Sequence, residues 1–330
     1  MFKRILVPLD GSHLSHQSLP YAKRIARCGG SELVLLRATP RPVSIAMTPE
    51  DVAVEIGERP PSPGVPFQPS PADRVFTAAP THLGDVRVER EVQQAAEELD
   101  TLQSQLRSEG LAVSTVVRPG EAADAILDVG REVSADLVVM STHGRGGVSR
   151  FLLGSVADKV VRHAEIPVML VRARDVHAEA PEFKRIMVPL DGSLAAAEIL
   201  PSVRELARCS GSEIVLLRVV PGEPESQIAD ARLPPTTRVE KTEVAGERAA
   251  TDYVQTLSTS AVHWGVPVRT LVQVGDPASV ILDTAQDMYA DLIAMSTHGL
   301  GGLRRFFLGS VAERVVRHAV APVMLFRAKE

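Results

Sequence analysis

The sequence lacks the features that mark a membrane, secreted or nucleic-acid-binding protein. No apolar run approaches the roughly 20 residues that a membrane-spanning helix needs. The N-terminal segment MFKRILVPLD has no long apolar stretch and no small-residue cleavage site, so we expect no signal peptide and a cytoplasmic protein. The 36 basic and 41 acidic residues give a net charge of −5 without long blocks of one sign. This balance argues against nucleic acid or an anionic membrane as the main partner.

The chain contains a long internal repeat. Met140 to Ala173 returns as Met295 to Ala328 with 25 of 34 positions identical, and Phe2 to Ser12 returns as Phe183 to Ser193 with 10 of 11 identical. A unit of about 165 residues is too long for a solenoid repeat and suits a compact domain. We therefore expect a first domain over residues 1–173, a polar linker over 174–182 and a second domain over 183–330.

Each copy alternates expected strands and helices. In the first copy the expected strands cover residues 3–9, 31–37, 112–117, 136–140 and 167–171, and the expected helices cover residues 14–28, 92–109, 122–132 and 155–163. This alternation of helices with nearly continuous apolar strands indicates an α/β fold with a parallel sheet covered on both faces. Right-handed crossovers then give two tandem, doubly wound, five-stranded sheets that bind ligands at the carboxyl ends of their strands.

The two copies differ most between their second and third strands. The first copy has 26 more residues there, and residues 40–80 hold ten prolines without hydrophobic periodicity. We expect a long, partly disordered loop within an insertion over about residues 40–86. The second copy has a shorter loop from Pro221 to about Val244.

Cysteine is scarce, and its two occurrences are equivalent. Cys28 and Cys209 each follow Ala-Arg near the end of an expected helix. We interpret them as a pair of structural thiols rather than as a disulfide.

A glycine-rich motif occurs in both copies. His143-Gly144 is followed after nine residues by Gly154-Ser155, and this spacing recurs in His298-Gly299 and Gly309-Ser310. Glycine lets the backbone approach a phosphate closely, and a helix start favours an anion. The sequence has no GxxxxGK[ST] and no GxGxxG after the first strand, so neither a P-loop nor a dinucleotide fingerprint applies. The pattern predicts an anion site of another kind.

Several residues of the motif allow a structural interpretation as well. Ser155 with Asp158, and Ser310 with Glu313, fit capping boxes, and Asp10 and Asp191 fit turn positions of Asp-Gly-Ser. The remaining polar candidates are histidines and arginines beside the motif: His143, His298, His163, His318, Arg150 and Arg305. The first two histidines have no further ligand at metal spacing, the next two suit a helix C-terminus, and the arginines suit phosphate contact or solvent equally.

With these motifs the chain resembles the universal stress protein family, whose ATP-binding members carry G-x2-G-x9-G-[ST] after the fourth strand. The resemblance covers both halves except the Pro-rich loop and the linker, and Ser141 and Ser296 stand where the family has its first glycine. It implies bound ATP, with or without Mg²⁺. An Asp at the end of the first strand, the backbone at the end of the second strand and the glycine-rich loop would hold the nucleotide. The implied site residues are Asp10, Ala38, Ser141, Gly144, Arg145, Gly154 and Ser155 in the first domain, and Asp191, Val219, Ser296, Gly299, Gly309 and Ser310 in the second.

The resemblance also implies a function and an assembly. We expect a stress-response regulator that acts through its conformation and an unknown protein partner, with no catalytic residue assigned. The alternatives are a weak ATP-hydrolysing, adenylate-forming or phosphoryl-transfer enzyme, and a nucleotide-free structural protein. The last strands of the two domains should pair about a pseudo-twofold axis, and whole chains could form homodimers. The first site should bind nucleotide more tightly or exchange it more slowly, because its long loop follows Ala38 and Leu300 replaces Arg145 in the second.

Overall fold

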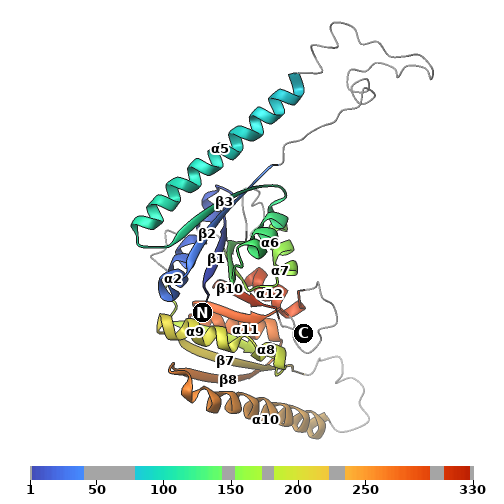
Figure 1. The fold of residues 1–330 in the computed structure, drawn as a ribbon. Helices are drawn as coiled ribbons and strands as arrows, with labels where there is room; N and C mark the ends of the chain where they lie inside the picture. Colours follow the sequence, from blue (N-terminus) through green and yellow to red (C-terminus); the bar gives the residue numbers. More distant parts are fainter. Residues whose placement is uncertain are drawn as a thin grey trace, which may run out of the picture.

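The strands of the described residues form a single ten-stranded sheet with a symmetric order (Figure 1). The structure is a computed structural model that describes residues 2–40, 79–142, 153–172, 182–222, 235–297 and 308–327. The strand order is β3-β2-β1-β4-β5-β10-β9-β6-β7-β8, so each half has the same internal order. All pairs within a half are parallel. The expected fold of two tandem, doubly wound, five-stranded sheets is confirmed.

Each described strand and helix of the first half has a counterpart in the second half, which has one additional short 3-10 helix. The strands are β1 (Arg4–Pro8), β2 (Glu32–Thr39), β3 (Val113–Pro119), β4 (Leu137–Ser141), β5 (Val168–Val171), β6 (Arg185–Leu190), β7 (Glu213–Val220), β8 (Val268–Val274), β9 (Leu292–Ser296) and β10 (Val323–Phe326). The helices are α1 (His13–His16), α2 (Leu19–Gly29), α5 (Ala79–Ser108), α6 (Ala122–Glu132), α7 (Ser155–His163), α8 (Leu194–Ala197), α9 (Leu200–Ser210), α10 (Pro235–Ala261), the 3-10 helix η2 (Val262–Trp264), α11 (Pro277–Asp287) and α12 (Ser310–His318).

The helix expected over residues 14–28 is divided into two. α1 ends at His16 and α2 begins at Leu19, with Pro20 in its first turn. The proline ring would clash with the carbonyl of residue 16 in a continuous helix, and it has no N–H to donate. Pro201 divides α8 from α9 in the same way. The prediction of one continuous helix was wrong because it followed only the apolar spacing.

The long helix α5 begins much earlier than the expected residue 92. It starts at Ala79 with Pro80 in the first turn, where a missing N–H costs no hydrogen bond. Residues 79–86 are therefore helical and not part of an irregular insertion. α10 likewise begins at Pro235, within the loop expected up to about Val244. The rest of the Pro-rich insertion, residues 41–78, lies outside the described residues.

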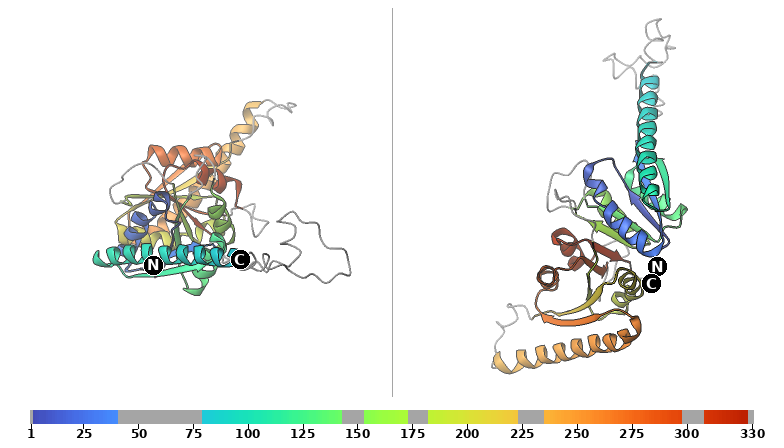
Figure 2. Two further views of the ribbon diagram at one scale, coloured as in Figure 1. Left: turned by 90° about the horizontal axis from the view of Figure 1, so that it is seen from above. Right: turned by 90° about the vertical axis from the view of Figure 1, so that its left-hand side faces the viewer.

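Both faces of the sheet are covered, and each covering layer contains helices of both halves. Along β2, Leu33 and Leu35 point to the layer of α2, α5 and α9, whereas Val34 and Leu36 point to the layer of α6, α7, α11 and α12. This alternation follows from the period of two in a strand. Figure 2 shows α5 and α10 at opposite ends of the molecule, next to the edge strands β3 and β8.

The two halves join through their last strands, as expected. β5 and β10 pair antiparallel, with Met169 opposite Met324 at the centre, and both side chains are almost completely buried. Two equal halves related by this antiparallel seam have the arrangement of a dimer within one chain. The seam turns two five-stranded sheets into a continuous sheet with a shared core.

A disulfide forms a second connection between the halves. Cys28 of α2 and Cys209 of α9 are bonded, with their Cα atoms 5.4 Å apart. The prediction of two structural thiols was therefore wrong. Sequence spacing separates the cysteines by 181 residues, but the symmetry of the two halves places equivalent positions of α2 and α9 against each other.

Candidate functional site

The carboxyl ends of three adjacent strands meet at one edge of each half. β1 lies between β2 and β4, and the chain crosses from one side of β1 to the other, which makes this edge the topological switch point. The strand registers, continued past the end of β1, put Asp10 level with Ala38 of β2 and with Thr142 after β4. The equivalent residues of the second half are Asp191, Val219 and Thr297.

Asp10 shapes the turn that follows β1. Its Oδ1 accepts hydrogen bonds from the Ser12 backbone N–H at 2.9 Å and from the Ser12 hydroxyl at 2.6 Å. Asp191 has the same two bonds with Ser193, also at 2.9 and 2.6 Å. Each serine in turn caps the short helix behind it. The turn-forming role of the two aspartates is confirmed, and their contact with a ligand stays a prediction.

A duplicated arginine beneath this turn was not among the expected site residues. Arg37 is nearly buried, and its Nη1 donates to the Leu9 carbonyl at 3.5 Å. Gly11 has a φ of +77°, which favours glycine, and a Cβ there would displace the Arg37 guanidinium. Arg218 in the second half donates to the Leu190 carbonyl at 3.5 Å. The presence of this arginine at the same position in both copies is the sequence signal that could have identified it as a site residue.

The partner of this arginine differs between the halves. Glu98 of α5 forms an ion pair with Arg37 at 3.5 Å, whereas Tyr253 of α10 holds the equivalent position near Arg218. Burial raises the pKa of Tyr253, and Asp191 adds to the effect. The Tyr253 hydroxyl is buried and has no hydrogen-bond partner among the described residues. A carboxylate therefore lies beside the first arginine and a neutral phenol beside the second.

His16 gives the first half a further titratable group at this edge. Partial burial of the imidazole lowers the pKa of His16 below its usual value of about 6.5, and the positive charge of Arg37 lowers it further. Asp10 acts in the opposite direction but has a smaller effect. The second half has Ala197 at the equivalent position. The described residues thus make the two edges electrostatically unequal.

The Gly-Ser pairs lie at helix starts next to the ends of β4 and β9. The backbone N–H of Gly154 donates to the Thr142 carbonyl at 3.0 Å, and that of Gly309 donates to the Thr297 carbonyl at 2.9 Å. Each glycine is the N-cap residue, and no side chain caps either helix. These bonds hold each helix N-terminus at the edge that carries the aspartate turn.

The capping-box interpretation was wrong. Ser155 and Ser310 are the first helical residues rather than N-caps, because the glycine before each occupies the cap position. Asp158 instead forms an ion pair with Arg162 at 2.8 Å, and Glu313 pairs with Arg317 at 2.6 Å. These pairs direct the acidic groups of the first turn along the helix, away from its N-terminus.

Close packing explains a glycine at the start of α12. A Cβ on Gly309 would lie 3.0 Å from the Thr297 carbonyl oxygen, a backbone atom that cannot rotate away. A larger residue would therefore push the helix start away from the end of β9. A glycine at a helix N-terminus also lets a phosphate come close to the backbone N–H groups.

The structure describes only part of the expected constellation. It brings together the described site residues of each half at one edge: Asp10, Ala38, Ser141, Gly154 and Ser155, and Asp191, Val219, Ser296, Gly309 and Ser310. Ser141 and Ser296 are buried as the last residues of their strands. The remaining candidates lie outside the described residues: His143, Gly144, Arg145, Arg150, His298, Gly299, Leu300 and Arg305. His163 and His318 lie in the last turns of α7 and α12, as expected.

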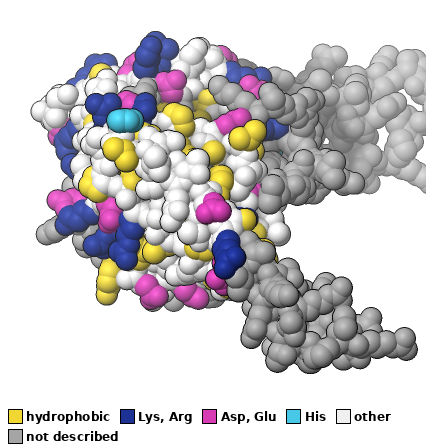
Figure 3. All heavy atoms as spheres, turned by 90° about the horizontal axis from the view of Figure 1, so that it is seen from below, with side chains coloured by type: hydrophobic (Ala, Val, Ile, Leu, Met, Phe, Trp, Pro, Cys, Tyr) yellow, Lys and Arg dark blue, Asp and Glu magenta, His cyan; other side chains and the backbone are white. Residues whose placement is uncertain are grey.

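The described part of the chain shows neither a metal-binding cluster nor a membrane-spanning helix. Within it, no group of three or more His, Cys, Asp or Glu residues is placed to hold a metal ion. Among its helices, none has both the length and the apolar character needed to span a bilayer. On the face seen in Figure 3, basic and acidic side chains are interspersed.

Comparison with known proteins defines the class to which this two-domain fold belongs. The model of the universal stress protein family matches residues 68–172 and 182–327. The chain belongs to the universal stress protein family.

The relatives match either nearly the whole chain or about half of it. The chain is 26% identical to universal stress protein Rv1996 of Mycobacterium tuberculosis over 98% of this chain and 94% of that protein. It is 32% identical to universal stress protein MJ0531 of Methanocaldococcus jannaschii over 44% of this chain and 82% of that protein. The crystal structure of a universal stress protein from Archaeoglobus fulgidus matches with a TM-score of 0.67 at 18% identity, covering 98% of each chain.

Solved structures of the family include a nucleotide complex. One universal stress protein was crystallised in complex with cAMP and matches at 19% identity with a TM-score of 0.31, covering 45% of this chain and 99% of that chain.

Proposed function

We propose that the protein is a nucleotide-binding regulator that holds ATP at the strand-end edge of each half. One observation carries the proposal. In both halves a helix that begins with Gly-Ser and has no side-chain cap is hydrogen-bonded to the residue after β4 or β9. This helix start lies at the edge that also carries the Asp-Gly-Ser turn. The first-turn N–H groups of an α-helix have no acceptor within the helix, and the helix dipole favours an anion there.

The residues present suit the parts of an adenine nucleotide. The N-termini of α7 and α12 would take the phosphates, with the Ser155 and Ser310 hydroxyls as further donors. Asp10 and Asp191 would accept hydrogen bonds from ribose hydroxyls, since a carboxylate accepts and does not donate. The backbone of Ala38 and Val219 would meet the adenine. The ion pairs of Asp158 and Glu313 reduce the repulsion that an acidic first turn would exert on a phosphate.

The proposed output is a change of conformation or partner rather than a reaction. A ligand that binds one conformation more tightly shifts the protein toward it, and a partner that reads this conformation transmits the signal. We propose the cytoplasm as the location. The inequality expected between the two sites rests on residues outside the described part, and it stays a prediction.

Native mass spectrometry of the protein purified from cells tests the proposal directly. Retained ATP supports a binding protein, and conversion of added ATP to ADP would instead support the enzyme alternative. Absence of any retained nucleotide, together with absence of binding in calorimetry, would contradict the proposal and favour a nucleotide-free structural protein.

The double variant Gly154→Val, Gly309→Val tests phosphate binding at the N-termini of α7 and α12. Valine at the N-cap should block the close approach of a phosphate and weaken ATP binding at least tenfold, or about 1.4 kcal/mol, in calorimetry. The matched control is Gly130→Ala in α6, where a Cβ would lie 3.7 Å from the Leu6 side chain, an ordinary contact. Unchanged affinity in a double variant with native circular dichroism would refute this site.

A further inference from the structure

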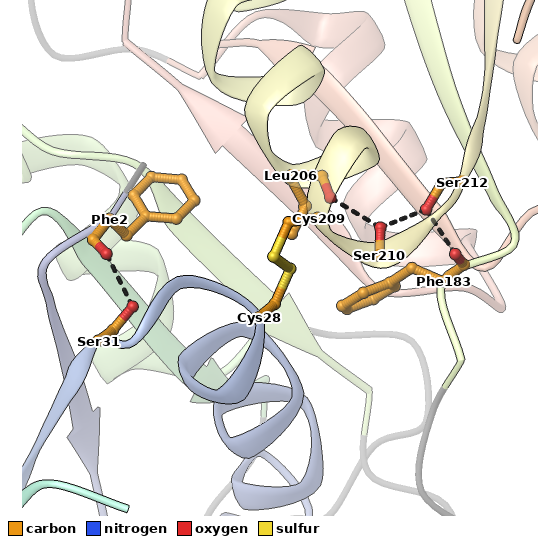
Figure 4. Close-up of a disulfide and its surroundings, with 8 residues drawn as sticks. All are labelled: Phe2, Cys28, Ser31, Phe183, Leu206, Cys209, Ser210 and Ser212. Atoms are coloured by element: carbon orange, nitrogen blue, oxygen red, sulfur yellow. Dashed lines mark hydrogen bonds between the residues drawn. A yellow bond between two sulfur atoms is a disulfide. The ribbon is translucent and has the colours of Figure 1, made fainter. Parts of the chain in front are cut away.

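The disulfide joins the two halves at a place that solvent can reach. Cys28 lies near the C-terminus of α2 and Cys209 near the C-terminus of α9, and the two helices lie against each other (Figure 4). Cys209 is exposed and Cys28 is only half-buried, although both helices bury apolar faces nearby. The two cysteines therefore lie at the rim of the core, where a small thiol can approach the disulfide.

The backbone around the cysteines is held by other bonds. The Ser31 hydroxyl donates to the Phe2 carbonyl at 2.7 Å, and the Ser212 hydroxyl donates to the Phe183 carbonyl at 2.5 Å (Figure 4). Each bond ties the end of one cysteine helix to the strand start of its own half. The local fold should therefore persist when the disulfide is open.

The contact between the halves also has other sources. The antiparallel β5–β10 seam and the shared core join the two halves, and the ring of Tyr21 of α2 lies 6.2 Å from that of Phe183. The halves should therefore stay together without the disulfide. Opening it releases only the direct link between the C-terminal ends of α2 and α9.

We propose that Cys28 and Cys209 form a reversible thiol–disulfide exchange site that fastens and releases α2 and α9 across the two halves. The sequence predicts a cytoplasmic protein, and thiol reductants keep most disulfides open in that compartment. The disulfide would then form when the thiol pool becomes oxidised. This proposal goes beyond nucleotide binding and does not depend on it.

A dithiol is the reductant that opens the disulfide. Its thiolate attacks Cys209 Sγ, forms a mixed disulfide and expels Cys28 as a thiolate, which takes up a proton. The second thiol of the reductant then attacks its own sulfur in the mixed disulfide and releases Cys209, which is also protonated. Two electrons and two protons pass to the protein, and the reductant leaves as a disulfide. A low-molecular-weight disulfide reverses the reaction by the same steps.

The two helices also connect this site to the strand-end edges. α2 follows the Asp10 turn after the short helix α1, and α9 follows the Asp191 turn after α8. Fastening the far ends of α2 and α9 restricts their relative movement, and so restricts the two turns relative to each other.

Peptide mapping provides a sharp test because trypsin cuts directly before both cysteines. The expected peptides are CGGSELVLLR from Cys28 and CSGSEIVLLR from Cys209. In native protein equilibrated with oxidised glutathione these should appear joined. After native treatment with dithiothreitol and then iodoacetamide, both should be alkylated while circular dichroism is unchanged. Alkylation that requires a denaturant, or failure of the joined peptide to form under oxidising conditions, would overturn the proposal.

Thermal unfolding with and without reductant provides an independent readout. Reduction should lower the unfolding midpoint of the wild type by roughly 4 °C or more. Cys28→Ser, Cys209→Ser should start near the reduced value and show no response to dithiothreitol. Ser210→Ala, next to Cys209, is the matched control and should keep the response. The proposal would be contradicted if dithiothreitol lowered the unfolding midpoint of the serine double variant, or if it left that of the wild type unchanged.

Discussion

Several residues at the strand-end edge stabilise the fold whether or not a ligand is bound. Asp10 organises its turn, Arg37 lies beneath Gly11, and Gly309 leaves room for the Thr297 carbonyl. A role in the fold does not exclude a role in binding, because a group held in one orientation by the protein loses less entropy when a ligand arrives. The duplication of these residues is therefore compatible with both roles.

The second half has alanine at the position equivalent to His16. The variant His16→Ala should therefore lose less free energy of unfolding than the wild type as the pH falls. A lowered folded-state pKa means that the unfolded chain binds more protons between the folded pKa and about 6.5. The wild type should therefore lose stability as the pH falls from about 6.5 through the folded pKa of His16, and His16→Ala should lose less. Urea unfolding from pH 5 to pH 7.5 measures the difference.

The control for this prediction is His263→Ala, at an exposed position of η2 and not among the groups that shift the pKa of His16. It should reproduce the wild-type slope. If His16→Ala and the wild type fall in parallel as the pH decreases, the histidine does not contribute in the way we describe.

At the scale of elements, the two halves use different chemistry to attach equivalent helices. Glu109, just after α5, forms ion pairs with Lys23 at 2.5 Å and with Arg27 at 2.6 Å on α2. In the second half Trp264 holds the equivalent position and packs against the core. One attachment therefore depends on charge and the other on apolar contact, although the sheet topology is the same.

Replacing Glu109 with glutamine should weaken the α2–α5 attachment and make it less sensitive to acid. The hydrogen bond from Lys23 holds the pKa of Glu109 below its usual value of about 4.5. This stabilisation is complete above the unfolded pKa and is lost as the pH falls through the folded pKa. Glu109→Gln should lower the free energy of unfolding at pH 7 by about 0.5–1 kcal/mol, as is usual for partly exposed ion pairs.

Denaturant unfolding at pH 7 and pH 3 checks this prediction, with Glu247→Gln at an exposed position of α10 as the control. The gap between Glu109→Gln and the wild type should close at the lower pH. A gap of equal size at both values would show that lost packing, not lost charge, causes the effect.

At the scale of the whole molecule, the seam between β5 and β10 joins the two halves into one sheet. Met169 and Met324 lie opposite each other there with relative exposures of 0% and 1%. Because both core layers continue across the seam, the halves should unfold as one unit while the seam is intact.

The double variant Met169→Ala, Met324→Ala should uncouple the halves. Each truncation of a buried methionine costs about 2–5 kcal/mol, and this loss falls on contacts that both halves share. In calorimetry under reducing conditions, the single transition of the wild type should broaden or split into two. The matched control is Met187→Ala in β6, which is equally buried but lies away from the seam, and which should lower the midpoint without splitting the transition. A sharp single transition in the double variant would contradict the uncoupling.

The sequence by itself determined the features that depend on local pattern and repetition. Apolar runs separated by helical spacing predicted the parallel sheets, and the bounds of α6 and α7 agree with expectation residue for residue. The strand ends that carry Asp10 and Ser141 were placed at one edge by the topology that such alternation imposes. Where local pattern misled, as in the division of α1 from α2, a proline outweighed the apolar spacing.

Only the tertiary structure decided which distant residues meet. The Cys28–Cys209 bond, the contact of Arg37 with the Asp10 turn and the Glu109 attachment join residues far apart in the chain or at the ends of different elements. Ser155 fitted a capping box by spacing, but the Gly154 bond to Thr142 moved the cap one residue earlier. The physical reason is common to all four: local periodicity specifies which face of an element is buried, whereas the packing of elements specifies which side chains lie within bonding distance.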